Sequence, residues 1–345
     1  MKKALITGIA GQDGSYLCDL LLSKGYAVHG VDLNVVIQNP DRYLGRLQPV
    51  LDRLVLHSTS MDDPHDVLAL IEAVRPDECY HMAAQSFVIR SFVDEFSTLN
   101  TNISGTHHLL AALHEKAPQC RFFFAASSEI FGDAKKTPQN ENTPICPRNP
   151  YGISKLTGYF LTRYYREDKK MHASSGILYN HESPRRGFDF VTRKITKTVA
   201  EIKYGRAKEL RLGNLEARRD WGFAADYVQA MWRMLQQDNP DDYVIATGET
   251  HSVREFIEKA FARADLDWKR YVVVDQELYR PTEPCELCGD STKARTTLSL
   301  SSGWTQLKKL PVRKGNCCGE RLKIRYISAH QIIFLVNKCH SHFPT

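Results

Sequence analysis

Two side chains near the middle of the sequence, Tyr151 and Lys155, have the spacing of an acid–base pair. Four residues is about one helical turn, so both side chains would share one face of a helix. A neighbouring ammonium group lowers the pKa of a phenol, and we therefore expect Tyr151 to act as a base at neutral pH. Tyr-x-x-x-Lys also occurs by chance in many helices, so the pair needs support from its surroundings.

A second polar group stands upstream of this pair, in the segment Ser127-Ser128-Glu129. The segment follows the apolar run 121–126, which has the composition of a strand. Glu129 thus comes directly after two hydroxyl residues, at the point where the strand is expected to end. Hydroxyls placed after a strand argue against a chance occurrence of the Tyr-x-x-x-Lys pair.

The amino terminus contains a glycine-rich turn with the order Gly8-x-x-Gly11-x-x-Gly14, which includes Gln12 and Asp13. Glycines allow a tight turn and a close approach of the backbone, and the amino end of a helix binds a pyrophosphate. Such a pattern is weak by itself, but here it lies between an expected first strand and first helix. We therefore predict that this turn binds a dinucleotide cofactor.

Asp32 ends the second expected strand. An acid at this position usually hydrogen-bonds the adenosine ribose hydroxyls and repels a 2′-phosphate. Asp32 therefore favours NAD over NADP, although it could also be a solvated acid in a loop.

The first half of the sequence alternates short apolar runs with amphipathic segments. The spacing predicts strands at 4–7, 27–32, 53–57, 78–83, 121–126 and 175–180. It predicts helices at 14–24, 64–74, 97–115 and 150–168. This alternation is typical of an α/β protein with a Rossmann-like, doubly wound parallel sheet.

The pattern changes after Glu182, where a basic, turn-like segment precedes further helices. We expect helices at 194–205, 226–237 and 252–264, with a short apolar run at 242–248. These elements would form a smaller α/β substrate-binding region over the carboxyl edge of the sheet, where ligands of such folds bind. We place a cofactor-binding domain at 1–178, which also receives parts of 220–250, and the second region at 179–345.

Composition excludes several classes of protein. The net charge of +6 comes from residues 301–345, which hold eight Lys or Arg and one acid, while residues 1–300 carry −1. We expect no nucleic acid partner, because no aromatic interleaving accompanies these charges. No segment has the ~20 apolar residues of a membrane span, and no export signal is visible. Nine cysteines without such a signal indicate reduced thiols and a cytoplasmic location.

The glycine turn, Ser127, Tyr151 and Lys155 together resemble the short-chain dehydrogenase/reductase superfamily. The resemblance extends to the GDP-mannose 4,6-dehydratase family, whose motifs run in order across residues 7 to 283: TGIAGQDGSYL, AAQSFV, SSEIFG, NPYGISK, NHESPRRG, FVTRKI, RRDWG and YRPTE. The resemblance implies a lyase that oxidises C4 of the sugar, eliminates water across C5 and C6, and returns the hydride to C6.

The same resemblance assigns roles to individual residues. Ser127, Glu129, Tyr151 and Lys155 would be catalytic, with Glu129 serving both proton transfers of the elimination because Ser128 cannot act as an acid. Besides the glycine turn, residues near the cofactor would be Met82, Ala83, Ala84, Gln85, Ser86, Tyr151, Lys155, His181 and Arg186. Residues that contact the GDP-sugar substrate would be Ser86, Asn180, Lys194, Arg219, Arg280 and Glu283.

Several alternatives stay open. The substrate could be a GDP-heptose, or the enzyme could be a GDP-sugar epimerase or reductase, although these do not need a carboxylate at Glu129. A different class, a catalytically impaired protein that senses its cofactor, is also compatible with the fold. The cofactor is NAD(P): the resemblance implies NADP, whereas Asp32 favours NAD. We expect a homodimer or homotetramer that does not bind membranes.

The carboxyl-terminal segment departs from the family pattern from about residue 297. The pair Cys285 and Cys288 has the spacing of half a zinc site, but a second half with ligand spacing is missing. We therefore expect free or structural thiols and no metal.

Overall fold

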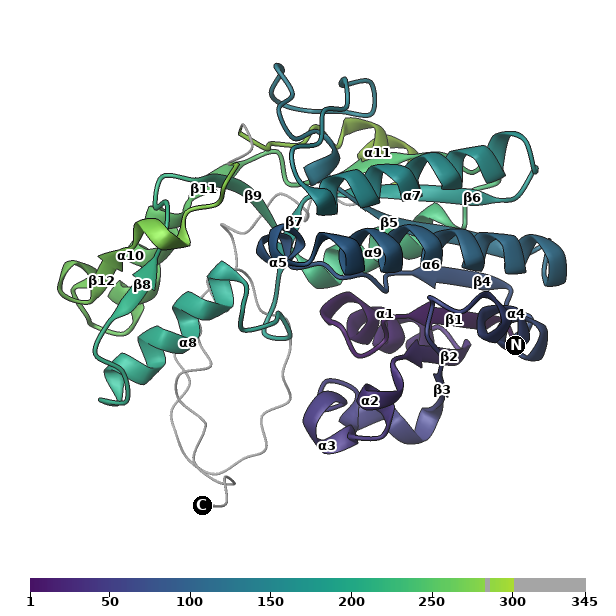
Figure 1. Cartoon of the computed structure of the whole chain (residues 1–345), viewed down its shortest axis with the longest axis horizontal. Helices are drawn as coiled ribbons and strands as arrows, with labels where there is room; N and C mark the ends of the chain where they lie inside the picture. The colour runs from purple at the N-terminus through teal and green to yellow at the C-terminus, as the bar shows by residue number, and fades with distance from the viewer. Residues whose placement is uncertain (283–285, 301–345) are drawn as a thin grey trace.

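A computed structural model describes residues 1–282 and 286–300. Its centre is a parallel sheet of seven strands in the order β10-β6-β5-β4-β1-β2-β3 (Figure 1). The strands are β1 (Lys3–Thr7), β2 (Ala27–Asp32), β3 (Leu54–Ser58), β4 (Glu78–His81), β5 (Arg121–Ser127), β6 (Ala173–Leu178) and β10 (Tyr243–Ile245). The predicted doubly wound α/β fold is confirmed.

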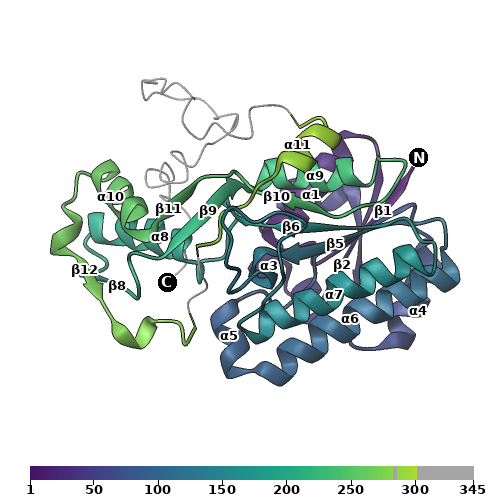
Figure 2. The same ribbon diagram turned by 90° about the horizontal axis from the view of Figure 1, so that it is seen from above.

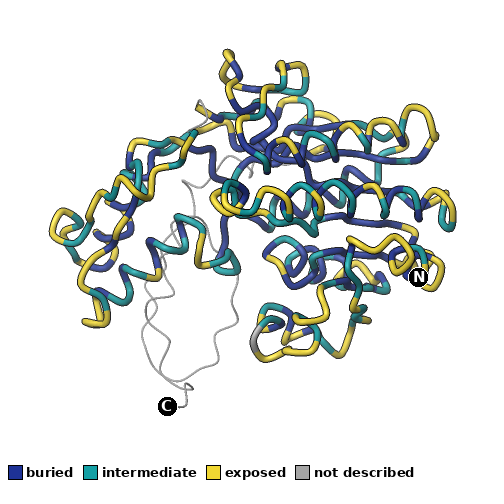
Figure 3. The backbone as a smooth tube through the Cα atoms, viewed as in Figure 1, coloured by how far each residue is buried: buried dark blue, intermediate teal, exposed yellow. Residues whose placement is uncertain are grey.

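Helices cover both faces of this sheet, as the view from above shows (Figure 2). One face carries α1 (Gln12–Ser23) and α9 (Ala224–Met234), and the other carries α4 (Pro64–Val74), α6 (Glu95–Lys116) and α7 (Pro150–Glu167). Because apolar layers lie above and below, the central strands are buried on both sides. All residues of β6 and nearly all of β5 are buried (Figure 3).

Shorter elements connect these layers. After β2 the chain forms α2 (Asn34–Ile37), α3 (Pro40–Tyr43) and η1 (Gln48–Arg53). Helix α5 (Val88–Val93) precedes α6, and the single turn η2 (Ser128–Ile130) follows β5 directly. Helix α11 (Thr292–Thr297) packs near β10. Within the described residues, no helix is both long and apolar enough to cross a bilayer.

A smaller region lies beside the carboxyl edge of the main sheet. It contains a sheet of β7 (Asn180–Glu182), β9 (Arg218–Phe223) and β11 (Thr250–Ser252), and a strand pair of β8 (Leu210–Leu212) and β12 (Val272–Val274). Helices α8 (Val191–Lys203) and α10 (Val253–Arg263) pack with these strands around a core of their own, and the turns η3 (Trp268–Arg270) and η4 (Gln276–Leu278) flank β12. Helix α8 ends before Gly205, whose φ of 69° lies in the left-handed region that glycine adopts at low cost.

Two strands end two residues earlier than predicted, β4 and β6. Strand β4 stops at His81, because the amides of Met82 and Ala83 turn to donate to the Thr7 hydroxyl at 3.2 and 3.1 Å. Strand β6 stops at Leu178, and Asn180 already belongs to β7 of the smaller sheet. The chain then returns to the main sheet at β10. The division of the chain into two domains at residue 178 stays a prediction. Residues 301–345, which were assigned to the second region, lie outside the described residues.

Candidate active site

A cavity of about 1250 Å³ lies at the carboxyl edge of the main sheet and extends beneath the smaller region. It is lined by every predicted site residue that the structure describes: Gly8, Gly11, Gln12, Asp13, Gly14, Asp32, Met82, Ala83, Ala84, Gln85, Ser86, Ser127, Glu129, Tyr151, Lys155, Asn180, His181, Arg186, Lys194, Arg219 and Arg280. Glu283 and Cys285 lie outside the described residues. The structure therefore brings the predicted residues that it describes to one place, and their individual roles stay proposals.

The glycine turn is shaped by close backbone contacts. Gly8 has a φ of 71°, in the left-handed region. A Cβ atom on Gly14 would lie 2.4 Å from the Gly8 carbonyl oxygen and 2.6 Å from the Ile9 Cα atom, so only glycine lets α1 begin this close to the turn. Gly11 precedes α1 without a capping side chain. The open amino end of α1 therefore faces the cavity and fits a pyrophosphate.

Asp32 lies at one end of the cavity with both carboxylate oxygens held by the backbone. Oδ2 accepts a hydrogen bond from the Ala10 amide at 3.1 Å, and Oδ1 accepts one from the Leu33 amide at 3.0 Å. Burial raises the pKa of Asp32. Arg46 also lines the cavity, but its guanidinium donates to the carbonyl oxygens of Ala10 and Arg185 at 2.9 and 2.8 Å.

Asp13 and His181 form a largely buried pair beside the glycine turn. His181 Nε2 lies 2.8 Å from Asp13 Oδ2, and its Nδ1 lies 2.7 Å from the Tyr179 carbonyl oxygen. Burial alone would raise the pKa of the Asp13 carboxyl, but His181 and Arg186 together hold that pKa below its usual value. Both ring nitrogens of His181 face acceptor oxygens, one from a backbone carbonyl and one from a carboxylate. The imidazole ring also stacks on Tyr227, with ring centroids 4.4 Å apart.

Tyr151 and Lys155 lie in the first turns of α7, both buried. Burial raises the pKa of Tyr151 to about 12, although the nearby Ser127 hydroxyl lowers it. Burial also lowers the pKa of Lys155 to about 8, and its ammonium donates to the Ala125 carbonyl oxygen at 2.8 Å. The prediction that Lys155 lowers the pKa of the Tyr151 phenol is wrong, because desolvation of the buried phenol dominates and raises this pKa.

Glu129 is the middle residue of η2 and lines the cavity at the end of β5. Its Oε2 accepts a hydrogen bond from Asn149 Nδ2 at 2.8 Å, and its Oε1 lies 3.4 Å from Arg280 Nη1. The amide of Glu129 in turn donates to the Ser127 hydroxyl oxygen at 3.2 Å. The carboxylate therefore shares the cavity with Tyr151 and has a cation close to one oxygen.

The segment 82–86 is held by a buried network that begins at Thr7. The hydroxyl of Thr106 donates to the Asn102 carbonyl oxygen at 2.7 Å, so it accepts from His81 Nε2 at 3.1 Å. His81 Nδ1 then accepts from the Thr7 hydroxyl at 2.8 Å. The Asn102 side chain binds the backbone of Gln85 at both ends. This network fixes the cavity wall that the segment forms.

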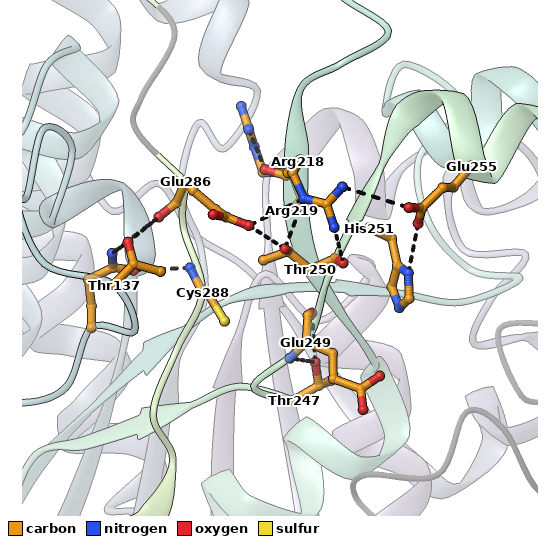
Figure 4. Close-up of polar contacts among 11 residues, drawn as sticks. Thr137, Arg218, Arg219, Thr247, Glu249, Thr250, His251, Glu255, Glu286 and Cys288 are labelled. Atoms are coloured by element: carbon orange, nitrogen blue, oxygen red, sulfur yellow. Dashed lines mark hydrogen bonds and ion pairs between the residues drawn. The ribbon is translucent and has the colours of Figure 1, made fainter.

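The smaller region contributes basic and amide side chains to the cavity. Asn180 begins β7, Lys194 lies in α8, Arg219 in β9, and Arg280 follows η4. In β9 Arg218 is exposed, whereas Arg219 and the three residues after it are buried. Arg218 lies 3.3 Å from Glu286 and 3.7 Å from Glu255, and both contacts are drawn in Figure 4. These ion pairs hold the strand that carries Arg219.

Comparison with known proteins is decisive for the family. The sequence model of the family described as GDP-mannose 4,6 dehydratase matches residues 5–310. The chain belongs to the GDP-mannose 4,6-dehydratase family. It is 44% identical to GDP-mannose 4,6 dehydratase 2 of Arabidopsis thaliana, over 94% of this chain and 89% of that protein. Identity to the GDP-mannose 4,6 dehydratase of Homo sapiens is also 44%, over 86% of each protein.

Solved structures share the fold of this family member. The dTDP-glucose 4,6-dehydratase DesIV of Streptomyces venezuelae, solved with NAD and TYD bound, matches with a TM-score of 0.75 at 22% identity, over 87% of this chain and 91% of that one. A Thermus thermophilus UDP-glucose 4-epimerase in complex with NAD matches with the same TM-score and identity over 97% of both chains. At this identity the likeness shows the fold alone.

Several residues of this dehydratase-family site were missed by sequence reasoning. Asn149 and Arg46 each make two polar contacts at the edge of the cavity, and His81 and Asn102 support its wall. For Asn149 a signal exists, since Asn before Pro at the start of a helix is typical of an N-cap. No sequence pattern indicates that the other end of its amide faces Glu129.

Proposed function

We propose that this protein is a nucleotide-sugar 4,6-dehydratase that converts GDP-mannose to GDP-4-keto-6-deoxymannose. The observation that carries the proposal is the place of Glu129 in the same cavity as Ser127, Tyr151 and Lys155. Hydride transfer at C4 needs only the last three residues. A further acid–base group is required to remove the C5 proton and the C6 hydroxyl, and Glu129 supplies it. Family membership at 44% identity supports the same reaction.

The cavity fits a nicotinamide dinucleotide on its glycine-turn side. Gly8, Gly11 and Gly14 leave a cradle that a Cβ atom would fill, and α1 begins there. Gln12, Asp13, Asp32, His181, Arg186 and residues 82–86 would hold the cofactor. When bound, this group supplies a reversible hydride acceptor, and its oxidised form carries a positive charge. We propose NAD, because the Asp32 carboxylate disfavours a 2′-phosphate and Arg46 already donates to two carbonyl groups.

Proton transfer at C4 is assigned to Tyr151. The Ser127 hydroxyl would hydrogen-bond the C4 oxygen, and the phenolate would take its proton as hydride leaves C4, which gives a 4-ketone. Lys155 contributes a buried cation held in place by the Ala125 carbonyl group. A positive charge near the phenol favours the phenolate and opposes the effect of burial.

Elimination is assigned to Glu129. The 4-ketone acidifies the C5 proton, and the carboxylate takes this proton. The resulting carboxylic acid then protonates the C6 hydroxyl, which leaves as water. Return of the hydride to C6 and delivery of a proton to C5, which balances the proton that Tyr151 took from the C4 hydroxyl, would complete the 4-keto-6-deoxy sugar and leave Tyr151 as the phenolate again. One carboxylate serves both transfers, because the neighbouring residue, Ser128, is not an acid.

The substrate diphosphate would bind the basic side chains of the smaller region. Lys194, Arg219 and Arg280 line the cavity from three different elements, and guanidinium groups can make bidentate contacts with phosphate oxygens. Asn180 and Ser86 would contact the sugar and its phosphate. Glu283, proposed for the guanosine ribose, lies outside the described residues.

We also propose a homo-oligomer, built on a dimer through α6 and α7. Ile153, Phe160 and Tyr164 recur on one face of α7 with 45%, 50% and 45% exposure, and Phe96 at the start of α6 is 84% exposed. An apolar face of this kind usually meets a partner, and a second copy is the simplest one. Sedimentation analysis of the wild type and of Phe160→Glu tests it: the wild type should sediment as a dimer or tetramer and the variant as a smaller species.

Incubation of the purified protein with GDP-mannose tests the proposed function. The product should show the alkali-induced near-ultraviolet absorbance of a 4-keto sugar and should have lost the mass of one water. A product that keeps its 6-hydroxyl group would indicate an epimerase or reductase. Turnover of a GDP-heptose in place of GDP-mannose would reassign the substrate, and no turnover of either would favour a protein that only binds its cofactor.

A further inference from the structure

The two carboxylate oxygens of Glu129 have different partners. Oε2 accepts from the Asn149 side chain at 2.8 Å, whereas Oε1 lies 3.4 Å from Arg280, which also lines the cavity. Asn149 is 4% exposed and does not line the cavity. It therefore contacts Glu129 from behind, on the side away from a bound substrate.

The same side chain also starts the helix that carries Tyr151 and Lys155. Asn149 Oδ1 accepts a hydrogen bond from the Gly152 amide at 2.7 Å, which makes Asn149 the N-cap of α7. An amide N–H can bond only to the oxygen end of this group. The NH₂ end must then face Glu129, so the orientation of the side chain is fixed by its surroundings.

The backbone around Asn149 is closely packed, which leaves this arrangement little freedom to change. A Cβ atom on Gly152 would lie 2.7 Å from the Glu129 carbonyl oxygen, so the first turn of α7 rests directly on the main chain of η2. The loop between them is closed by hydrogen bonds from the Cys146 amide to the Ile130 carbonyl oxygen and from the Asp133 amide to the Cys146 carbonyl oxygen, both at 3.0 Å.

We propose that Asn149 is a positioning residue for the elimination step. Its NH₂ group holds one oxygen of Glu129, favours the charged carboxylate, and leaves the other oxygen to exchange protons with the substrate. Because its oxygen end caps α7, the same amide couples the place of Glu129 to that of Tyr151. This inference rests on the proposed function and adds the residue that orients its elimination base.

The effect of losing this contact follows from its neighbours. The charged or titratable groups found next to Glu129 are Tyr151 from α7 and Arg280 from the segment after η4. Loss of the Asn149 donor leaves these groups in place and removes one stabilising contact from the carboxylate. Elimination should then slow while oxidation at C4 continues.

Two substitutions separate the role of the Asn149 NH₂ group as a donor to Glu129 from the role of its oxygen as the N-cap of α7. Ser and Asp are as good as Asn at an N-cap, so Asn149→Ser and Asn149→Asp keep α7 capped and remove the NH₂ group. For Asn149→Ser, elimination should slow by roughly 10- to 100-fold, the range for a hydrogen bond to a charged group. Asn149→Asp should be slower still, because it places a second carboxylate against Glu129 where the wild type has a hydrogen-bond donor.

The readout must distinguish oxidation at C4 from elimination. Single turnovers with GDP-mannose measure both: near-ultraviolet absorbance reports reduced nicotinamide on the holoenzyme, and mass spectrometry reports the lost water. In Asn149→Ser we expect oxidation at the wild-type rate and accumulation of reduced nicotinamide. Asp63→Ser is the matched control, since Asp63 is the N-cap of α4 and does not line the cavity. Its rates of oxidation and elimination should equal those of the wild type.

A third variant, Glu129→Gln, distinguishes a failure of the proposed function from a failure of the role proposed for Asn149. If Glu129→Gln eliminates water normally, the proposed role of Glu129 fails and with it this inference. If Glu129→Gln stops elimination while Asn149→Ser eliminates water at the wild-type rate, only the role of Asn149 is overturned. A variant Asn149→Ser that loses oxidation and elimination in equal measure would also overturn it, because that result is expected from a cap alone.

Discussion

Asp13 and His181 stand 168 residues apart in the chain, yet their side chains meet at 2.8 Å beside the glycine turn. The contact joins the first helix of the main sheet to β7 of the smaller region. Both side chains are largely buried. The contact therefore ties the two walls of the cavity together at a place with little solvent.

We predict measurable energetic coupling between Asp13 and His181. Removal of one partner leaves the other charge buried, so a double-mutant cycle of Asp13→Asn and His181→Gln should give a coupling energy of about 1–3 kcal/mol. Urea unfolding of the four proteins measures it. The more exposed pair His251 and Glu255, whose side chains lie 2.9 Å apart, is the control and should couple by less than about 0.5 kcal/mol. Equal coupling in both cycles would contradict the account.

Cofactor choice is predicted to depend on the charge of Asp32. Asp32→Asn keeps an acceptor oxygen for one of the two amides, Ala10 or Leu33, that bind the carboxylate, and it removes the repulsion of a 2′-phosphate. The ratio of NADP affinity to NAD affinity should rise by about tenfold or more, since one charge contact contributes on the order of 1–2 kcal/mol. Binding titrations of both cofactors check this. Asp52→Ser removes an exposed acid outside the cavity and should leave the ratio unchanged; an unchanged ratio in Asp32→Asn would refute the role of Asp32.

Acid should destabilise the protein through His81. Burial and the charge of Lys155 lower the pKa of His81 to about 3, below the value of about 6.5 in an unfolded chain. Between these values the unfolded state binds more protons, so this contribution is complete above about pH 6.5 and is lost as the pH falls. The slope should reach about 1.4 kcal/mol per pH unit. Urea unfolding at several pH values measures it, and His81→Gln should flatten the curve. An equal slope in the variant would exclude His81 as the cause.

Two glycines offer a test of the cofactor turn. Gly14→Ala would place a Cβ atom 2.4 Å from the Gly8 carbonyl oxygen, and the backbone there has no room to yield. We expect a loss of about 1–3 kcal/mol in stability together with weaker cofactor binding. A Cβ atom on Gly45 would meet nothing within 4 Å, and Gly45 has no positive φ, so Gly45→Ala should change stability by less than about 0.5 kcal/mol. Similar effects at both positions would argue against a packed turn.

The fold was predictable because its signals are local. Apolar runs of strand length alternate with amphipathic segments over the first half of the chain, and a parallel sheet follows from that order. The short strands β7, β8 and β11 have three residues each and carry too little periodicity to be recognised. Their pairing depends on contacts between distant segments, which the sequence does not display.

The site was predictable as a set of residues and not as an arrangement. Motif matches named Glu129 and Arg280, but the 3.4 Å approach between them depends on how the smaller region packs. Spacing placed Lys155 beside Tyr151, yet the extent of burial, which sets the pKa of the phenol, is a property of the whole fold. Asn149 was not predicted as a site residue, because a helix N-cap is a common local feature. Its second contact, with Glu129, depends on how distant segments pack and is not visible in the sequence.

The central claim, an internal oxidation and reduction with loss of water, is tested most directly with GDP-mannose that carries deuterium at C4. The account predicts a product that has lost one water and carries the deuterium at C6. Deuterium that remains at C4 or passes to solvent, or a product that keeps its 6-hydroxyl group, would contradict it.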